Sequence, residues 1–302
     1  MKIGILGPGG VGGLLAAVLD RPGNEVIVVA RESTAAEIEA HGVRLRSVTF
    51  GELTARPRAC ARLQEPVDAL LVATKAAGLE PALERIAVEP ELVLPLLNGL
   101  DHMQVLRARF APERVLAGSI RVEADRPAPG VVVHTSPFLL VSMASAHAEL
   151  QAPMRELGKM LGEAGVPVRI EDSEAQVLWS KLVRLNALAC TTSAYDKLLG
   201  EIRSTPALRA DLVGAIEEAC AVARAEGAAD TDPARALEEL ERAHDTLGSS
   251  MQRDIAAGRE PELDAIPGSV LRAARRHGLA CPTIERLVGM IAQRAGIATP
   301  AA

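Results

Sequence analysis

A glycine-rich segment near the N-terminus constrains the fold more than any other feature of the sequence. The segment Gly7-Pro8-Gly9-Gly10-Val11-Gly12 follows the apolar run Ile3–Leu6 and precedes helix-forming residues from Leu14 to Leu19. A GxGxxG pattern between a predicted strand and a predicted helix is typical of a dinucleotide-binding turn. Its glycines permit the tight turn, the approach of the backbone to a pyrophosphate, and close packing of helix on sheet. The six residues therefore predict a cofactor-binding turn, with a ligand-free glycine turn as the alternative.

The residue that follows the second predicted strand bears on which dinucleotide binds. This strand spans residues 25–30, and Arg31 and Glu32 come directly after it. In such units an acidic side chain near this position accepts the ribose 2′-hydroxyl of NAD, whereas an arginine suits a 2′-phosphate. Arg31 therefore predicts NADPH as the cofactor. In the alternative, Arg31 is solvated and Glu32 binds the ribose of NAD.

Length, charge and cysteine content limit the classes of protein to which the chain can belong. The 302 residues are enough for two domains. The net charge of −6 and the lack of basic blocks predict neither a nucleic-acid nor a membrane partner. The four cysteines are far apart in the sequence, which predicts no metal site and no disulfides.

The N-terminus superficially resembles a secretory signal, because Met1-Lys2 precedes an uncharged stretch. The break at Gly7–Gly10 would interrupt the apolar helix that such a signal needs. A cytoplasmic location is therefore predicted.

Strand and helix patterns alternate in the first part of the chain and give way to helices in the second. Up to residue 172, strands are predicted at 3–6, 25–30, 43–48, 53–58, 68–74, 92–97, 115–122, 131–134, 138–141 and 166–170, and helices at 14–19, 33–40 and 148–164; the strands around Gly51 are predicted to form a hairpin. Beyond residue 172, helices are predicted at 174–199, 208–225, 234–247, 266–277 and 283–295. The first of these helices is predicted to be capped by Asp172 or Ser173. The sequence thus predicts an α/β fold, with a Rossmann-type doubly wound sheet in an NADP-binding domain at 1–172 and an all-helical substrate-binding domain at 173–302.

Polar residues follow two of the predicted central strands. Lys75 comes after the strand at 68–74, and Asn98 after the strand at 92–97. Ligands of open α/β sheets bind beyond the carboxyl ends of the strands, so both side chains are candidate ligand contacts. A solvated lysine and an ordinary Asn98-Gly99 turn are the alternatives.

Two features of the second part could carry chemistry. Lys181 lies in the predicted helix at 174–199 among apolar neighbours, which disfavour the charged form of lysine and so favour proton donation. In the alternative, the lysine stem lies on the core and its ammonium group in water. The charge-dense segment from Ser249 to Asp264 is predicted to be a solvated loop after a helix.

These residues together resemble the ketopantoate reductase (2-dehydropantoate 2-reductase) family over essentially the whole chain. The matching parts are the glycine turn, Arg31, Thr74-Lys75-Ala76, Leu97-Asn98-Gly99, Trp179-Ser180-Lys181-Leu182 and the block from Ser249-Ser250-Met251 to Glu262-Leu263-Asp264, which ends at Gly268. The resemblance implies Lys181 and Glu262 as catalytic residues, with Lys181 the proton donor. It also implies substrate contacts from Asn98, Lys181, Ser250 and Glu262, and cofactor contacts from Lys75 and Asn98.

The chain departs from the family pattern along the helix of Lys181. Members often carry asparagines four and eight residues after the lysine, on the same helix face, where this chain has Leu185 and Ala189. Asn186 is offset by about 100° of helix rotation. A third position that is polar in some members is Leu199 here. The pocket is therefore expected to be less polar, unless Thr191, Thr192 and Ser193 compensate.

The first functional hypothesis is NADPH-dependent reduction of the C2 ketone of 2-dehydropantoate, a step of pantothenate biosynthesis. The alternatives are a reductase of the same fold for a less hydroxylated 2-oxo acid, and a non-catalytic NADP(H)-binding sensor. Ala-rich helices pack equally well within a chain or between chains, so the sequence is compatible with a homodimer.

Overall fold

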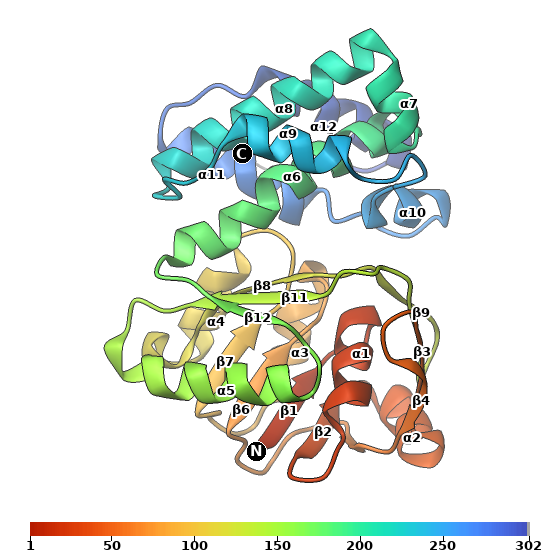
Figure 1. Cartoon of the computed structure of the whole chain (residues 1–302), viewed down its shortest axis with the longest axis vertical. Coiled ribbons are helices and arrows are strands. Elements are labelled where there is room, and N and C mark those ends of the chain that lie inside the picture. The colour runs from red at the N-terminus through yellow and green to blue at the C-terminus, as the bar shows by residue number, and fades with distance from the viewer. Residues whose placement is uncertain (301–302) are drawn as a thin grey trace. The chain divides into compact units, whose positions relative to one another are not determined.

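Continuous apolar runs in the N-terminal part form a parallel sheet, as the sequence predicts. The computed structural model describes residues 1–300. Strands β1 (Lys2–Leu6), β2 (Glu25–Val29), β5 (Arg58–Cys60), β6 (Ala69–Val72) and β7 (Leu92–Pro95) are all parallel and pair in the order β5-β2-β1-β6-β7 (Figure 1). The strand order reverses beside β1, and in such sheets ligands bind at this point, beyond the carboxyl ends of the strands.

Helix α1 (Gly10–Leu19) contacts both the central sheet and a second sheet. The second sheet has the order β4-β3-β10-β9 and consists of β3 (Val43–Ser47), β4 (Gly51–Ala55), β9 (Ala124–Ala128) and β10 (Val131–His134). Residues 12–19 of α1 are all buried, because the helix packs on strands of both sheets. The predicted hairpin is confirmed as the antiparallel pair β3–β4, although β4 begins at Gly51 rather than at Leu53.

A third sheet, with the order β12-β11-β8, completes the N-terminal part. It contains β8 (Ala117–Arg121), β11 (Leu140–Ala144) and β12 (Val168–Ile170), and α5 (Gln151–Glu163) packs on β12. The other helices here are α2 (Glu32–His41), α3 (Leu79–Leu83) and α4 (His102–Arg109), with 3₁₀ turns at 76–78, 112–114 and 148–150. Sequence patterns missed β5 and β9. The Pro127 in β9 disfavours a strand, but β9 is the edge of its sheet, where a residue without an N–H is tolerated.

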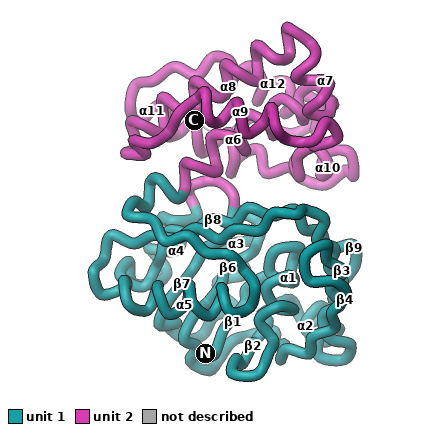
Figure 2. The backbone as a smooth tube through the Cα atoms, viewed as in Figure 1, with its two compact units in different colours: residues 1–97, 102–177 teal, residues 98–101, 178–302 magenta. Residues whose placement is uncertain are grey.

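The chain divides into two compact units (Figure 2). The first comprises Met1–Leu97 and His102–Val177, and the second comprises Asn98–Asp101 and the chain from Leu178 onward. The division falls within α6 (Glu174–Tyr195), which begins just after the boundary proposed at residue 172. Of the two predicted caps, Asp172 and Ser173, it is Ser173 whose Oγ accepts a hydrogen bond of 3.2 Å from the N–H of Gln176.

Described residues 178–300 contain helices and no strands, which confirms the helical C-terminal part of the predicted fold class. After α6 come α7 (Leu199–Ser204), α8 (Pro206–Ala225), α9 (Pro233–Glu241), α10 (Ser250–Ala256), a π-helical turn (Asp264–Gly268), α11 (Ser269–Arg276) and α12 (Pro282–Ala295). The helix predicted at 174–199 ends at Tyr195, because Asp196 adopts a φ of +52°. The prediction of a solvated loop from Ser249 to Asp264 is wrong for its first half, since α10 begins there and buries Met251, whereas residues 257–260 are exposed and not helical.

His134 is buried within the second sheet between two serine hydroxyls. Its side chain is 1% exposed, with Nδ1 2.8 Å from Ser47 Oγ and Nε2 3.2 Å from Ser136 Oγ. Burial lowers the pKa of His134 below its usual value of 6.5. The folded chain therefore favours the neutral imidazole.

We expect this histidine to make stability depend on pH. Its folded-state pKa lies below its unfolded-state pKa, so the unfolded chain takes up the proton first as pH falls through 6.5 and the free energy of unfolding decreases. One proton contributes at most about 1.4 kcal/mol per pH unit. Urea unfolding at pH 7.5 and 5.5 should show a larger loss for the wild type than for His134→Gln. The exposed-histidine variant His41→Gln should behave as the wild type does; equal losses in all three proteins would contradict the assignment.

Candidate active site

The glycine turn combines three crowded positions with one that has room. Gly7 has a φ of +89°, and an added Cβ there would lie 2.7 Å from Thr74 Cγ2. A Cβ on Gly12 would overlap the Gly7 carbonyl oxygen, and one on Gly10 would overlap the carbonyl oxygen of Ala124 in β9. At Gly9, the nearest atom to an added Cβ would be 4.0 Å away. Gly7, Gly10 and Gly12 therefore serve packing, while Gly9 leaves space at the N-terminus of α1, where backbone N–H groups favour an anion.

Thr74, just beyond the end of β6, carries a polar atom that needs a partner. Its Oγ1 is buried and has no hydrogen-bond partner within residues 1–300. Gly7 of the glycine turn is its neighbour. A buried hydroxyl without a partner costs about 1–3 kcal/mol, and a bound dinucleotide could supply the missing bond. Together with the space at Gly9, this orphaned hydroxyl fits a nicotinamide dinucleotide at this turn.

Arg31 and Glu32, the two residues considered for cofactor choice after β2, differ in their ion pairs. Arg31 is exposed at the N-cap of α2 and has no ion-pair partner among the described residues. Glu32 Oε1 lies 3.1 Å from Arg85 Nη1, and that guanidinium also donates to the Ala61 carbonyl. A hydrogen bond from its own backbone N–H, helped by Arg85, lowers the pKa of the Glu32 carboxyl. Glu32 thus pairs with Arg85 while its side chain stays 76% exposed, and Arg31 is exposed without an ion pair among the described residues.

Lys75 follows Thr74 and is exposed at the N-cap of the 3₁₀ turn at 76–78. It lies in the first unit, whereas Asn98 is grouped with the second. The two strand-end residues of the sequence prediction therefore belong to different units.

Three predicted residues of the second unit form one hydrogen-bonded array. Lys181 Nζ donates to Asn98 Oδ1 at 2.7 Å, and Asn98 Nδ2 donates to Glu262 Oε2 at 3.0 Å. A lysine ammonium can only donate and an ionised carboxylate can only accept, so these partners fix the orientation of the Asn98 amide. The ammonium is therefore hydrogen-bonded to a side chain, and Lys181 is partly buried. The array presents a cation whose position is set by a neutral amide, and that amide is in turn held by an anion.

A close backbone approach supports this array. Gly99 has a φ of +85°, and an added Cβ would overlap the carbonyl oxygen of Ala265 in the π-helical turn. Pro267 lies inside that turn and has no N–H, and the Leu263 carbonyl instead accepts a bond of 3.1 Å from the Gly268 N–H. The turn therefore widens directly after Glu262. The Asn98-Gly99 pair is therefore more than an ordinary turn, because Gly99 packs on the Ala265 carbonyl and Asn98 bonds to Glu262.

The face of α6 beyond Lys181 carries apolar groups where family members often have asparagines. Leu185 and Ala189 follow the lysine by one and two helical turns in a regular α-helix. Asn186 is fully buried, and its Nδ2 has no partner among the residues described. It is offset by about 100° of helix rotation from Leu185, the position of the first family asparagine.

The hydroxyl residues that follow on α6 serve the structure. Thr191 Oγ1 donates to the Ala187 carbonyl at 2.8 Å, and Thr192 Oγ1 donates to the Leu188 carbonyl at 2.7 Å. Thr192 and Ser193 also contact Ser249 Oγ, the N-cap of α10. These buried hydroxyls are committed to the helix and to the cap, so they do not compensate for the missing asparagines.

Ser250 is the first residue of α10 and is partly exposed. Within the described chain it forms no hydrogen bond with Lys181, Asn98 or Glu262. Its role as a substrate contact stays a prediction. A pattern that could have revealed α10 is Ser249-x-x-Gln252, which is typical of a helix start; the Gln252 N–H donates to Ser249 Oγ at 3.0 Å.

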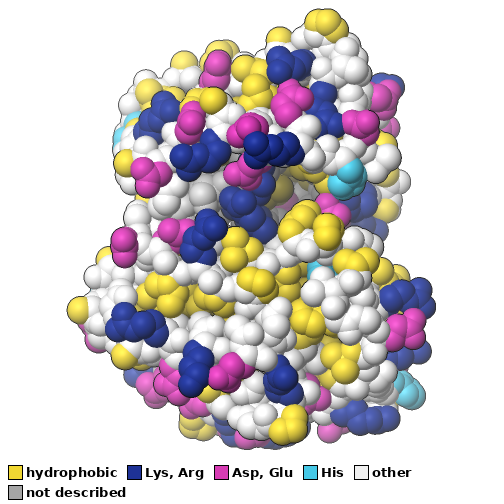
Figure 3. All heavy atoms as spheres, in the orientation of Figure 1, with side chains coloured by type: hydrophobic (Ala, Val, Ile, Leu, Met, Phe, Trp, Pro, Cys, Tyr) yellow, Lys and Arg dark blue, Asp and Glu magenta, His cyan; other side chains and the backbone are white. Residues whose placement is uncertain are grey.

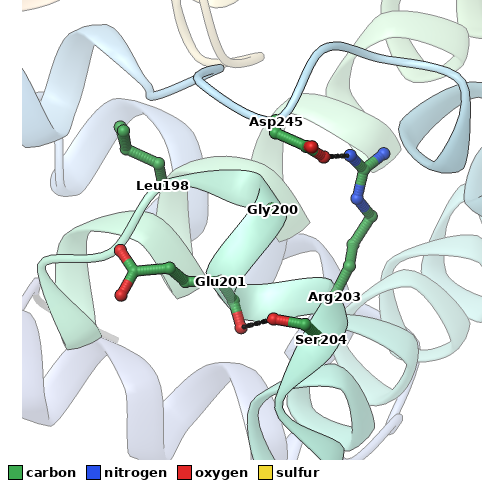
Figure 4. A pocket seen from close by; sticks show the side chains of 6 residues that line it. All are labelled: Leu198, Gly200, Glu201, Arg203, Ser204 and Asp245. Atoms are coloured by element: carbon green, nitrogen blue, oxygen red, sulfur yellow. Dashed lines mark hydrogen bonds and ion pairs between the residues drawn. The ribbon is translucent and has the colours of Figure 1, made fainter.

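A hollow of about 550 Å³ in the second unit lies apart from this array (Figure 4). It is lined by Leu198, Gly200, Glu201, Arg203, Ser204 and Asp245. Arg203 bonds to three carbonyls after and at the end of α9, those of Leu240, Glu241 and Ala243, and to the Asp245 carboxylate. This arginine therefore fastens a loop. Leu199, the third position where the family pattern differs, is buried beside the hollow.

Three features of the described residues relate to nucleic-acid, membrane and metal binding. Acidic and basic side chains are interspersed on the face shown in Figure 3. Across residues 1–300 no helix is both long and apolar enough to span a membrane. In the same residues there is no group of three or more His, Cys, Asp or Glu side chains that could bind a metal.

Known proteins match the chain over nearly its whole length. A family model described as Ketopantoate reductase PanE/ApbA matches residues 3–142, and its C-terminal counterpart matches residues 173–295. A 2-dehydropantoate 2-reductase of Mycobacterium tuberculosis is 31% identical, and an uncharacterized oxidoreductase, YkpB, of Bacillus subtilis is 29% identical; the alignments cover 96% and 94% of this chain and 96% of each relative. The structure of D-mandelate dehydrogenase with NADH and anilino(oxo)acetate has the same fold, with a TM-score of 0.89 at 22% identity and 98% coverage of both chains. The chain belongs to the ketopantoate reductase family, whose members are oxidoreductases.

Proposed function

We propose that the chain reduces the C2 ketone of a 2-oxo acid with NADPH, and that 2-dehydropantoate is the first candidate substrate. The observation that carries the proposal is the array of Lys181, Asn98 and Glu262. The 2-dehydropantoate 2-reductase relative at 31% identity supports this choice of substrate.

The array fits the needs of carbonyl reduction. Bound NADPH would supply the hydride, which forms the new C–H bond at C2 while the electrons of the C=O π bond move to oxygen. Lys181 stabilises the charge that develops on this oxygen and then donates a proton to it, which leaves a neutral amine that takes a proton from water. Asn98 holds the ammonium through its Oδ1 atom, and Glu262 orients Asn98. The Glu262 carboxylate can also accept a hydrogen bond from a substrate hydroxyl.

Arg31 is the basis for proposing NADPH rather than NADH. We expect Arg31→Ala to raise the Kd for NADPH about 10- to 100-fold, the effect of losing a charge-assisted bond of roughly 1.5–3 kcal/mol. NADH binding should hardly change. Glu32→Gln is the matched neighbour and should leave NADPH binding intact, because Arg85 already engages that carboxylate. Equal losses for both cofactors in Arg31→Ala, measured by fluorescence titration, would argue against a 2′-phosphate contact.

Thr74→Val should change stability and cofactor binding in opposite directions. The substitution keeps the shape but removes the orphaned hydroxyl, so the cofactor-free protein should gain about 1 kcal/mol in its free energy of unfolding. NADPH should bind several-fold more weakly, as expected for a lost neutral hydrogen bond. Thr54→Val, on β4, should alter neither quantity by a comparable amount. Unchanged NADPH affinity in Thr74→Val would remove this hydroxyl from the cofactor site.

A less hydroxylated 2-oxo acid is the second candidate substrate, and Leu185 and Ala189 favour it. NADPH oxidation should be measured with 2-dehydropantoate, with branched aliphatic 2-oxo acids and with phenylglyoxylate. Highest kcat/KM for 2-dehydropantoate supports the first candidate, and higher values for the apolar acids select the second. If none of these acids is reduced, the remaining hypothesis is a non-catalytic NADP(H)-binding sensor.

Three further expectations stay predictions. A role in pantothenate biosynthesis depends on 2-dehydropantoate being the substrate. A cytoplasmic location and assembly as a homodimer are proposals on the same footing.

A further inference from the structure

Arg272 of α11 links the two chain segments that carry Asn98 and Glu262. Its Nη2 donates to Asp101 Oδ2 at 2.6 Å, and its Nη1 donates to Asp264 Oδ1 at 2.7 Å. Nη2 also donates to the Asp264 carbonyl at 2.9 Å. Asp101 lies three residues after Asn98, and Asp264 lies two residues after Glu262. One guanidinium thus connects the Asn98–Asp101 segment to the start of the π-helical turn.

The two segments meet at two further points. Gly99 approaches the Ala265 carbonyl so closely that no Cβ fits between them. The Asn98 amide donates to the Glu262 carboxylate at 3.0 Å. The guanidinium joins the same two segments at Asp101 and Asp264, and we expect it to hold them at the separation that the amide–carboxylate bond requires.

We propose that Arg272 is a positioning residue that fixes Asn98 against Glu262 and thereby sets the location of the Lys181 ammonium. The proposal rests on the proposed function, in which that ammonium serves the substrate carbonyl. Arg272 itself belongs to the supporting structure and touches no reacting atom.

The fork of the guanidinium suits this role better than a point charge would. The Asp101 and Asp264 carboxylates are both exposed to water, and ion pairs with exposed carboxylates contribute little to stability. A planar fork that binds two partners at once adds directional restraint. Its loss should therefore affect catalytic geometry more than the free energy of unfolding.

The test compares Arg272→Met with Arg276→Met. Arg276 lies one turn further along α11 and pairs with Glu226 at 3.1 Å, so its variant also loses an ion pair but leaves the two segments alone. We expect Arg272→Met to lower kcat about tenfold, within the range known for a misplacement of reacting groups. The Kd for NADPH and the activity of Arg276→Met should stay near the wild-type values. Arg272→Lys should recover only part of kcat, because lysine lacks the fork.

A double-mutant cycle separates positioning from general destabilisation. In an Asn98→Ala background, Arg272→Met should lower kcat by less than about twofold, since the residue that it positions is already gone. Full multiplication of the two effects, or wild-type kcat in Arg272→Met, would overturn the proposal.

A crystal structure of Arg272→Met gives a readout that does not depend on turnover. The Asn98 Oδ1–Lys181 Nζ distance should increase from 2.7 Å to beyond hydrogen-bond range. An unchanged distance would contradict positioning even if the enzyme is active. A lengthened distance in a chain that turns over no 2-oxo acid would preserve the positioning role and reject the proposed function.

Discussion

We expect replacement of Lys181 with alanine to lower kcat for 2-oxo acid reduction about a hundredfold or more, the scale of a lost general acid. The substitution removes both the cation beside the developing oxyanion and the proton that this oxygen must receive. It leaves untouched the glycine turn and Arg31, so NADPH should bind with its wild-type Kd. Stopped-flow or steady-state absorbance at the NADPH band measures kcat, and fluorescence titration measures the Kd.

Lys197→Ala is the matched control for this experiment. Lys197 is an exposed lysine of the second unit, and its ammonium pairs with Glu201 at 2.8 Å. Loss of this pair should leave kcat within about twofold, because exposed ion pairs contribute little. If Lys181→Ala kept wild-type kcat, the lysine would have no part in the reaction. A loss of the same size in both variants would indicate a structural effect.

The second large effect is expected at Gly99. Alanine there must adopt a φ of +85° and must also displace the Ala265 carbonyl oxygen. The strain and the overlap together should cost about 2–4 kcal/mol in the free energy of unfolding. The displacement should also pull Asn98 from Glu262, so kcat should fall at least about tenfold, as expected for misplaced catalytic groups.

Gly278→Ala separates strain from overlap. Gly278 has a φ of +65°, but an added Cβ would have no atom within 4 Å. Its alanine variant should lose only about 1–2 kcal/mol from the left-handed conformation and keep its kcat. Urea unfolding and turnover of the two variants test the prediction. Equal behaviour of the two would mean that the contact with Ala265 has no importance for the site.

The elements nearest the glycine turn could be predicted from the sequence because their signals are local. Apolar runs of strand length predicted β1, β2, β6 and β7, and the glycine pattern predicted a helix after the turn, although α1 begins at Gly10 rather than at Leu14. The edge strands β5 and β9 were missed, because one is three residues long and the other contains a proline. Each of these strands forms only by pairing with one neighbour, β2 for β5 and β10 for β9, and that pairing is set by the fold rather than by the local sequence.

The site itself lay beyond local patterns. Lys181 lies 83 residues from Asn98, and Asn98 lies 164 residues from Glu262, so only the resemblance to a family brought them together before the structure did. Arg85 and Arg272 were not predicted at all. Arginines are common in this sequence, and the fold alone decides which carboxylate each one meets.

Transfer of deuterium tests the central claim most directly. The protein should be incubated with 2-dehydropantoate, or with the best substrate of the panel, and with NADPH that carries deuterium at both C4 positions. Mass spectrometry of the product should show a 2-hydroxy acid with one deuterium at C2, because the hydride passes directly from the nicotinamide to that carbon. A hydroxy acid without deuterium, or no hydroxy acid from any 2-oxo acid, would contradict the proposed reaction.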